Sequence, residues 1–419
     1  MNTASETATP FSAVLLTPSQ PKKEITPADI HSKWDLWSSG VSLLRGANVW
    51  QALVLSKVDG VVFKGDGRVG PPFTQEDFYN LASLGANYVV ISGPGLFTEK
   101  PPYQVDMEVQ ENLDHLLEMI ANADMFATIA LRSGPGKAEW SLCCWGEPYY
   151  RGYFNDRIWT DSAAQQAWVD MWQYTAERYH DNPIVVGYKL MVEPNASEVL
   201  FNISEPEEFH KYYSGSLADW NILYPQIVTG IRKTDSETPI LVGSDGYSSI
   251  NWLPFLKPVN DLYIVYVVHQ YSPYEQYTHQ DPWGNNSYPD TFDTNNDRKE
   301  ETFDRNWLIN LLLPVSNYFL ENNSPIAVDE FGICRWVPGA AEYMYDLMGL
   351  FEENSWNYAI WEWATSYRPF EEEVHDFNFR FGSDPKLRFS IENSPLMDVI
   401  MYYWSMNIIR PSNVNFVNK

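Results

Sequence analysis

The segment Val185–Val192 has the sequence VVGYKLMV and is followed directly by Glu193 and Pro194. A short, almost continuous apolar run is typical of a strand that other elements cover on both faces, as in a parallel sheet flanked by helices. Runs of the same kind, rich in Val, Ile and Tyr, recur along the chain. The predicted strands are Ser42–Asn48, Ala86–Ile91, Phe126–Leu131, Val185–Val192, Ile240–Gly243, Leu262–His269, Ile326–Glu330 and Asn357–Trp363.

Segments with apolar residues at helical spacing separate these strands. The predicted helices are Thr74–Leu84, Val109–Asn122, Asp161–Tyr179, Ser216–Lys233, Thr302–Asn322, Ala340–Glu353 and Pro395–Ile409, with a weak signal over Ser244–Asp261. Strand and helix alternate, which predicts an α/β fold with parallel strands. Eight such units in about 390 residues predict one (β/α)₈ barrel, a fold of roughly 250 residues that often carries insertions. The long irregular segments follow strands, so we expect them at the carboxyl face of the barrel, where active sites lie.

The charge of the chain excludes two classes of partner. There are 28 Lys and Arg residues against 55 Asp and Glu residues, so the formal net charge is −27. Such a surface repels nucleic acid and anionic lipid, and we expect neither as a partner. No apolar run is long enough to cross a membrane. Three cysteines give no disulfide framework, and no cysteine–histidine spacing indicates a metal site.

The first residues differ in composition from the rest. Residues 1–29 carry scattered Thr, Ser and Pro and are predicted to form a flexible tail, whereas residues 30–419 are predicted to form the single barrel domain. The apolar patch Ala13–Leu16 is too short for the core of a secretory signal, and no basic segment precedes it. We therefore expect a cytoplasmic protein, or a secreted one if a signal was removed ahead of residue 1.

Two glutamates end predicted strands. Glu193 follows the fourth strand, and Glu330 ends the seventh within PIAVDEFG at positions 325–332. Because the carboxyl ends of barrel strands meet at one face, we expect the two side chains to lie across the mouth from each other. Glycoside hydrolysis requires such a pair: one carboxyl protonates the leaving oxygen, and the other attacks the anomeric carbon or activates water. One such glutamate alone is more often an ion-pair partner, so the pairing carries the prediction.

Further short motifs lie at the ends of other predicted strands. They are Arg45-Gly46-Ala47-Asn48, Gly85-Ala86-Asn87, His269-Gln270-Tyr271, Glu330-Phe331-Gly332, Glu193-Pro194 and the tryptophans Trp361 and Trp363. With these motifs in this order, the sequence resembles glycoside hydrolase family 5, the cellulase and mannanase family, from about Arg45 to Trp363. The resemblance implies a (β/α)₈ enzyme that retains the anomeric configuration, binds carbohydrate, and needs no metal or cofactor.

The resemblance also implies roles for individual residues. Glu330 would be the nucleophile and Glu193 the acid/base, with carboxyl groups about 5–5.5 Å apart. The charge of Glu330 would raise the pKa of Glu193. Tyr271 would hydrogen-bond Glu330 and keep it ionised. The predicted substrate-binding residues are Asn48, Trp50, Arg132, Asn195, His269, Tyr271, Trp361 and Trp363.

Three positions depart from the family pattern. Val192 replaces the asparagine that hydrogen-bonds the sugar 2-hydroxyl, and Val90 replaces an arginine that supports the nucleophile. Arg132 replaces a histidine, and it is our candidate for restoring the missing positive charge from a neighbouring strand. Asn195 and Arg132 are the candidates for a replacement contact to the 2-hydroxyl.

The expected substrate is a β-linked glucan, mannan or related oligosaccharide. One alternative is an exo-acting β-glycosidase on small glycosides, which the missing signal and the long loops favour. A second alternative, from another class, is a non-catalytic carbohydrate-binding barrel, which Val192 and Val90 make conceivable. The sequence leaves the sugar, the linkage, a structural calcium and the oligomeric state open.

Overall fold

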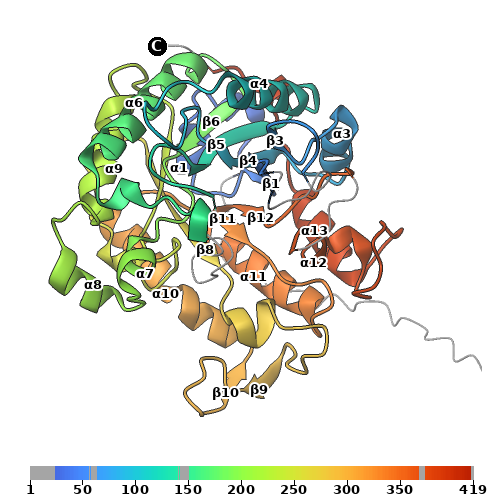
Figure 1. Ribbon diagram of the computed structural model, residues 1–419. Helices are drawn as coiled ribbons and strands as arrows, with labels where there is room; N and C mark the ends of the chain where they lie inside the picture. The colour runs from blue at the N-terminus through green and yellow to red at the C-terminus, as the bar shows by residue number, and fades with distance from the viewer. Residues whose placement is uncertain are drawn as a thin grey trace, which may run out of the picture.

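The computed structural model of the protein describes residues 24–55, 57, 64–139, 141, 151–367 and 373–416. Within these residues, eight parallel strands form a closed barrel (Figure 1). Around the barrel the order is β1 (Arg45–Trp50), β4 (Tyr88–Pro94), β5 (Phe126–Ser133), β6 (Val185–Lys189), β7 (Ile240–Gly243), β8 (Ile264–Gln270), β11 (Ile326–Phe331) and β12 (Asn357–Ile360), which pairs with β1. Each predicted strand is a barrel strand, so the predicted (β/α)₈ fold is confirmed.

An outer ring of helices covers the barrel (Figure 1). Its members are α3 (Gln75–Ser83), α4 (Met107–Asn122), α6 (Ser162–Tyr179), α9 (Trp220–Ile231), α10 (Arg305–Asn322), α11 (Ala340–Asn354) and α13 (Pro395–Trp404). The segment with the weak helix signal, 244–261, holds the single 3₁₀ turn η4 (Leu253–Phe255). No helix in the described part of the chain is long and apolar enough to span a membrane.

Shorter elements lie in the connecting segments. They are α1 (Asp35–Ser38), β2 (Ala52–Leu53), β3 (Val69–Gly70), α7 (Ala196–Phe201), α8 (Pro206–Tyr213), β9 (Asp290–Phe292), β10 (Glu301–Phe303) and α12 (Glu373–Asp376). β9 and β10 form an antiparallel hairpin that extends away from the barrel (Figure 1). The predicted helix over 302–322 therefore begins later, at Arg305. Asp304 sets this boundary because its side chain accepts hydrogen bonds from the backbone N–H groups of Asn306 and Trp307.

The barrel interior is filled by small aliphatic side chains. Val90, Ala130, Val192 and Val267 are buried in one cluster that continues toward the amino ends of the strands. The two valines that depart from the family pattern thus point into this apolar core, where a polar side chain would need its own hydrogen-bond partners.

The amino-terminal end of the barrel is closed by both ends of the described chain. Ile25, Ile30 and Trp37 belong to the interior cluster, and so does Ile409. Ile25 is buried, which corrects the predicted boundary between tail and barrel at residue 30: the packed chain already includes the last residues of the predicted tail. Burial of an isoleucine removes its apolar surface from water, and this favours the docked segment. Residues 1–23 of that tail lie outside the described residues.

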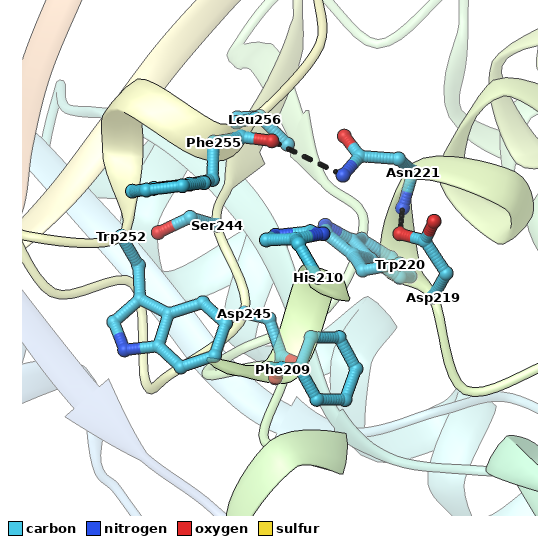
Figure 2. A pocket seen from close by; sticks show the side chains of 10 residues that line it. All are labelled: Phe209, His210, Asp219, Trp220, Asn221, Ser244, Asp245, Trp252, Phe255 and Leu256. Carbon is cyan, nitrogen blue, oxygen red and sulfur yellow. Dashed lines mark hydrogen bonds between the residues drawn. The ribbon is translucent and has the colours of Figure 1, made fainter. Parts of the chain in front are cut away.

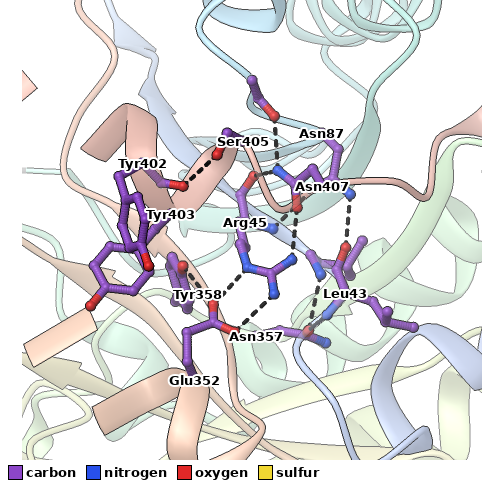
Figure 3. A network of polar contacts seen from close by, with 12 residues as sticks. Leu43, Arg45, Asn87, Glu352, Asn357, Tyr358, Tyr402, Tyr403, Ser405 and Asn407 are labelled. Carbon is purple, nitrogen blue, oxygen red and sulfur yellow. Dashed lines mark hydrogen bonds and ion pairs between the residues drawn. The ribbon is translucent and has the colours of Figure 1, made fainter. Parts of the chain in front are cut away.

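A polar network ties β1 to its neighbours at the same end (Figure 3). The guanidinium of Arg45 donates to both carboxylate oxygens of Glu352, at 2.6 and 2.8 Å, and to Asn407 Oδ1 at 3.0 Å. Asn87 accepts from the Arg45 backbone N–H at 3.0 Å. Two motif residues of the resemblance, Arg45 and Asn87, therefore join strands far from the mouth. A bidentate guanidinium–carboxylate pair is a strong, directional contact.

An irregularity in β11 decides how the other end of the barrel is built. Val328 of β11 pairs with Val268 of β8. The next pair joins Glu330 to His269, so β11 advances by two residues where β8 advances by one. Asp329 is thus an extra residue, a β-bulge, between the two paired positions. Because the bulge interrupts the alternation of side chains, Asp329 and Glu330 both reach His269. Asp329 Oδ1 lies 3.5 Å from Nε2 of the ring, and Glu330 Oε1 lies 3.6 Å from Nδ1.

Candidate active site

The two predicted carboxylates meet at the mouth of the barrel. Glu193 follows β6, Glu330 lies in β11, and each offers a carboxylate oxygen within 4.8 Å of the other and of a ring nitrogen of His269. His269 Nδ1 lies 2.7 Å from Glu193 Oε1 and 3.6 Å from Glu330 Oε1. The expected close pairing is therefore present.

Glu193 owes its position to the way the chain leaves β6. Regular pairing of β6 ends at Lys189, yet Leu190 N still donates to Leu241 at 3.2 Å and Val192 N to Leu131 at 2.8 Å. The backbone of Glu193 then adopts a left-handed conformation, with φ of 51°. Few residues other than glycine adopt this region, and such conformations gather at functional sites. The turn directs the carboxylate toward His269.

His269 connects the carboxylates to a buried ion pair beneath them. Its Nε2 lies 2.6 Å from Lys189 Nζ, and that ammonium lies 2.7 Å from Asp329 Oδ2. Burial would lower the pKa of His269, but the charge of Glu330 and the hydrogen bonds to Asp329 and Glu193 outweigh burial and raise the pKa to about 9. Neither Lys189 nor Asp329 was among the residues predicted for the site. An isolated lysine within the apolar run of β6 was the signal that could have found the pair.

The two carboxyl groups differ in acidity. Burial alone would raise the pKa of Glu193, but the hydrogen bond and charge of His269, together with the charge of Arg132, lower it below its ordinary value. For Glu330, burial and the nearby charge of Glu193 raise the pKa, despite the opposing charge of His269. The expectation that Glu193 has the raised pKa is therefore wrong for the free protein. The reason is the contact to His269, which sequence positions alone did not reveal.

Arg132 brings positive charge to the pair from β5. Its guanidinium donates to Glu139 Oε1 at 2.9 Å and to Ser92 Oγ at 3.2 Å, and it lies 5.5 Å from the centre of the Trp361 ring. Its charge acts on both Glu193 and Glu330, whose negative charges help to raise the pKa of Arg132 in turn. This is the position expected of a replacement for the missing arginine at Val90. Glu139 also accepts from Trp50 Nε1 at 3.1 Å, which adds Trp50 to the same network.

Tyr271 lies where the resemblance implied. Its hydroxyl is 3.1 Å from Glu330 Oε1 and donates to it. The Tyr271 ring also contacts His279 and Phe377, with ring centres 5.0 and 6.2 Å away. Beyond these two rings lies a pocket of about 280 Å³, which Trp336, Cys334 and Arg388 also line. Neither Tyr271 nor the two glutamates line this pocket, which lies on the other side of the His279 and Phe377 rings.

Three residues predicted to bind substrate are instead bonded to the protein. Asn48 is buried and its Nδ2 donates to the backbone carbonyl of Asp329 at 2.8 Å. Asn195 is buried and donates to the Ser141 carbonyl at 2.7 Å. Trp363 is 1% exposed. These three predictions are corrected: each side chain supports the walls of the site and does not line it.

The two tryptophans that follow β12 differ in their contacts. Trp363 donates from Nε1 to the Asp77 carbonyl at 3.0 Å, and the Arg380 guanidinium covers its ring at 3.9 Å. Trp361 faces Arg132, and its Nε1 is without a hydrogen-bond partner among the described residues. This Nε1 is buried, so a contact of Trp361 with substrate stays a prediction.

The trio of Glu193, His269 and Glu330 also deserves comparison with a metal site. Two carboxylates and an imidazole within 4.8 Å are donors that bind divalent cations in other proteins. Here, however, the Lys189 ammonium lies 2.6 Å from the far nitrogen of the ring, so the cluster already contains a positive charge. Arg132 adds further positive charge, which repels a cation. The donor set therefore fits a hydrogen-bonded cluster better than a metal centre.

A second hollow lies away from the carboxylates, between α8, α9 and the segment after β7 (Figure 2). It measures about 10 Å³, which is room for one water molecule. The His210 ring stacks on Phe255 at 5.4 Å, and Asp245 below it accepts from the backbone N–H groups of Gly246 and Ser197. Tight packing and satisfied hydrogen bonds make this hollow part of the fold, with no space for a sugar.

The fold and the site together define a (β/α)₈ barrel with a carboxylate pair at its carboxyl face, the arrangement of glycoside hydrolases. Comparison with known proteins specifies the family: the cellulase family, glycosyl hydrolase family 5, matches residues 56–366. The chain belongs to this family.

Individual relatives are distant. Endoglucanase C of Acetivibrio thermocellus is 23% identical over 214 residues, which are 49% of this chain and 52% of that protein. The chain thus spans about half the length of the curated relatives it matches. Among solved structures, endoglucanase Cel5A from the hyperthermophilic Thermotoga maritima superposes with a TM-score of 0.59 and 17% identity, covering 90% of this chain and 100% of that chain. A hyperthermophilic endo-β-1,4-glucanase in complex with substrate gives 0.59 and 18%, covering 88% and 99%. At these identities the likeness shows the shared barrel fold.

Proposed function

We propose that the protein is a retaining β-glycoside hydrolase that cleaves β-linked glucans or related oligosaccharides. One observation carries the proposal: two carboxylates from opposite sides of the barrel mouth lie within 4.8 Å of each other. That spacing suits attack by one carboxylate on the anomeric carbon while the other handles the proton of the leaving group. The endoglucanase names of the relatives support a glucan as the substrate.

In this proposal Glu330 attacks the anomeric carbon and forms a glycosyl-enzyme. Glu193 protonates the leaving oxygen and afterwards removes a proton from the incoming water. Before substrate binds, the proton of the pair is more stable on Glu330 than on Glu193, because the pKa of Glu330 is raised and that of Glu193 is lowered. A bound sugar reverses it: positive charge that develops at the anomeric carbon favours the ionised form of Glu330, so the proton of the pair goes to Glu193.

Chemical rescue with azide distinguishes the two roles. Glu330→Ala with an activated aryl β-glycoside and azide should give the α-glycosyl azide, because azide attacks the anomeric carbon directly as the aryl group leaves. Glu193→Ala should still form the glycosyl-enzyme, and azide then displaces Glu330 to give the β-glycosyl azide. NMR of the products measures the anomeric configuration. The reverse assignment of the two azides would contradict our roles, and two fully active variants would contradict catalysis at this pair.

The mode of cleavage follows from a second measurement on the wild-type protein. Endo action lowers the viscosity of a soluble β-glucan faster than it releases reducing ends, whereas exo action does the reverse. We expect endo action. Release of single sugars from chain ends would favour the β-glycosidase alternative, and binding without hydrolysis of any aryl β-glycoside or glucan would favour the non-catalytic barrel.

A further inference from the structure

Beneath the carboxylate pair, a line of three short contacts runs through the barrel interior. Asp329 Oδ2 lies 2.7 Å from Lys189 Nζ, Lys189 Nζ lies 2.6 Å from His269 Nε2, and His269 Nδ1 lies 2.7 Å from Glu193 Oε1. The Lys189 and Asp329 side chains are each 1% exposed. Burial of two charges is costly and is repaid only by good geometry, so the pair calls for an explanation beyond stability.

The donors and acceptors along this line limit where the protons of Lys189 and His269 can lie. An ammonium has three donors and no acceptor, and a doubly protonated imidazole also has only donors. A contact of 2.6 Å between Nζ and Nε2 therefore holds one shared proton, whether it resides on the amine or on the ring. As long as the Lys189–His269 pair carries one positive charge, the other ring nitrogen, Nδ1, carries the remaining proton. That N–H faces Glu193 Oε1 and donates to it.

We propose that Lys189 and Asp329 are positioning residues that fix a proton on His269 Nδ1, so that the histidine always presents a donor to Glu193. Asp329 holds the ammonium on the side of the ring opposite the carboxylates, and the bulge in β11 brings Asp329 there beside Glu330. The inference rests on the proposed function, because it assigns the pair a purpose in the acid/base step of Glu193.

The consequence for catalysis is a constraint on Glu193. A permanent donor at 2.7 Å orients the carboxylate and favours its ionised form, which the second step needs in order to accept a proton from water. Without the lysine, an Nε2–H group would be free to donate a hydrogen bond to Asp329 Oδ1, 3.5 Å away. The ring would then hold both protons as a full cation between three carboxylates.

Other charged and titratable groups face the same cluster and must be considered in any pH experiment. They are Glu330 on β11, Arg132 on β5, Lys137 after β5, Tyr88 on β4, Tyr271 after β8 and His279 in the same segment. In the described part of the chain, none of these groups lies within hydrogen-bonding distance of His269 Nε2. Lys189 and Asp329 are thus the groups that control that nitrogen.

The test compares the wild type with Lys189→Met, Asp329→Asn and the double variant. Lys189→Met leaves a buried carboxylate without its partner and can fail to fold, whereas the double variant removes both charges together. In the double variant the positive charge that Lys189 and His269 share in the wild type resides on the ring alone, next to Glu193, and we expect it to lower the pKa of Glu193 further. The basic limb of the kcat/KM profile should then move down by about 1 pH unit, a roughly tenfold loss of activity on the basic side.

A direct readout does not depend on activity. In protein with ¹⁵N-labelled histidine, the His269 signals are identified among the seven histidines by their loss in His269→Gln. In the wild type we expect a proton on Nδ1 and, on Nε2, a proton shared with Lys189; in the double variant we expect a full proton on each nitrogen. A wild-type signal with an unprotonated Nδ1 overturns the proposal. So does a double variant whose ring signals and pH limbs both match the wild type.

Glu352→Gln is the matched control, because it breaks a half-buried ion pair at the opposite end of the barrel (Figure 3). It should lower the melting temperature and leave the pH limbs in place. If the wild-type protein hydrolyses no glycoside, the proposed function fails, while the ¹⁵N spectra still decide where the proton lies. If the protein hydrolyses glycosides and needs Glu193 and Glu330 to do so, a double variant with unchanged pH limbs and unchanged ¹⁵N spectra overturns only the positioning role of Lys189 and Asp329.

Discussion

At the scale of single residues, the length of Arg132 explains how the site does without the family's arginine. Val90 is small and packs within the barrel, so the charge must come from a longer side chain on the next strand. The charge of Arg132 acts on both carboxylates while Glu139 and Ser92 hold its guanidinium. An arginine suits this task because its planar group donates several directional hydrogen bonds at once and stays charged when buried. The electrostatic function is thus retained although the position has changed.

The two tryptophans of strand eight give a prediction at this scale. Trp363→Phe removes the hydrogen bond to the Asp77 carbonyl, so the free energy of unfolding should fall by about 0.5–1.5 kcal/mol. KM should stay as in the wild type. Trp361→Phe, the matched change, removes no bond within the protein and should raise KM at nearly unchanged stability. Urea unfolding and steady-state kinetics measure both; a raised KM for Trp363→Phe would restore it as a sugar platform.

At the scale of elements, the bulge in β11 is held from the neighbouring strand β1. Asn48 Nδ2 donates to the carbonyl of Asp329, the extra residue, at 2.8 Å. The contact fixes the backbone directly before Glu330. We therefore expect Asn48 to act on the placement of Glu330, the proposed nucleophile, rather than on the sugar.

This placement predicts a split in the kinetics of Asn48→Ala. We expect kcat to fall by roughly tenfold or more, because a small displacement of a reacting group is costly, while KM changes little. Asn48→Asp keeps the shape of the side chain but replaces the donor with a carboxylate, and it should lose kcat as well. An increase in KM at constant kcat would show that Asn48 binds substrate after all.

The pattern of the sequence was sufficient for the strands and for the two glutamates, because near-continuous apolar runs and strand ends are local features. The surroundings of Glu330 were not predictable in the same way. Strict alternation places Asp329 and Glu330 on opposite faces, and only the register shift against β8 brings both to His269. Trp361 and Trp363 could not be told apart for a related reason: their roles depend on Arg380 and Arg132, from distant parts of the chain.

At the scale of the whole molecule, the cluster around His269 makes stability depend on pH. The pKa of His269 is raised to about 9 in the folded protein from an ordinary value near 6.5. A raised pKa means that the folded state holds the proton more tightly, so this stabilisation is complete below pH 6.5 and is lost as the pH rises toward 9. Burial lowers the pKa of Lys33 and Lys137 to about 8, and these groups act with the opposite sign above that value.

We therefore expect the free energy of unfolding to fall between pH 6.5 and 8. Urea unfolding at several pH values in this window measures the slope, and His269→Gln should flatten it. His180→Gln, which changes a surface histidine next to Asp181, is the control and should keep the wild-type slope. Equal slopes for the wild type and His269→Gln would show that His269 does not hold its proton more tightly in the folded state.

The closure of the barrel at its amino-terminal end has a practical consequence. Ile25 packs there from one direction, and Phe416 reaches the Phe126 ring from the other, with ring centres 6.3 Å apart. Both described ends of the chain thus leave the molecule on the side away from Glu193 and Glu330. A tether attached through either end, to a bead or to a second module, would hold the protein with its mouth turned outward. An insoluble polysaccharide could then approach the carboxylates without meeting the support.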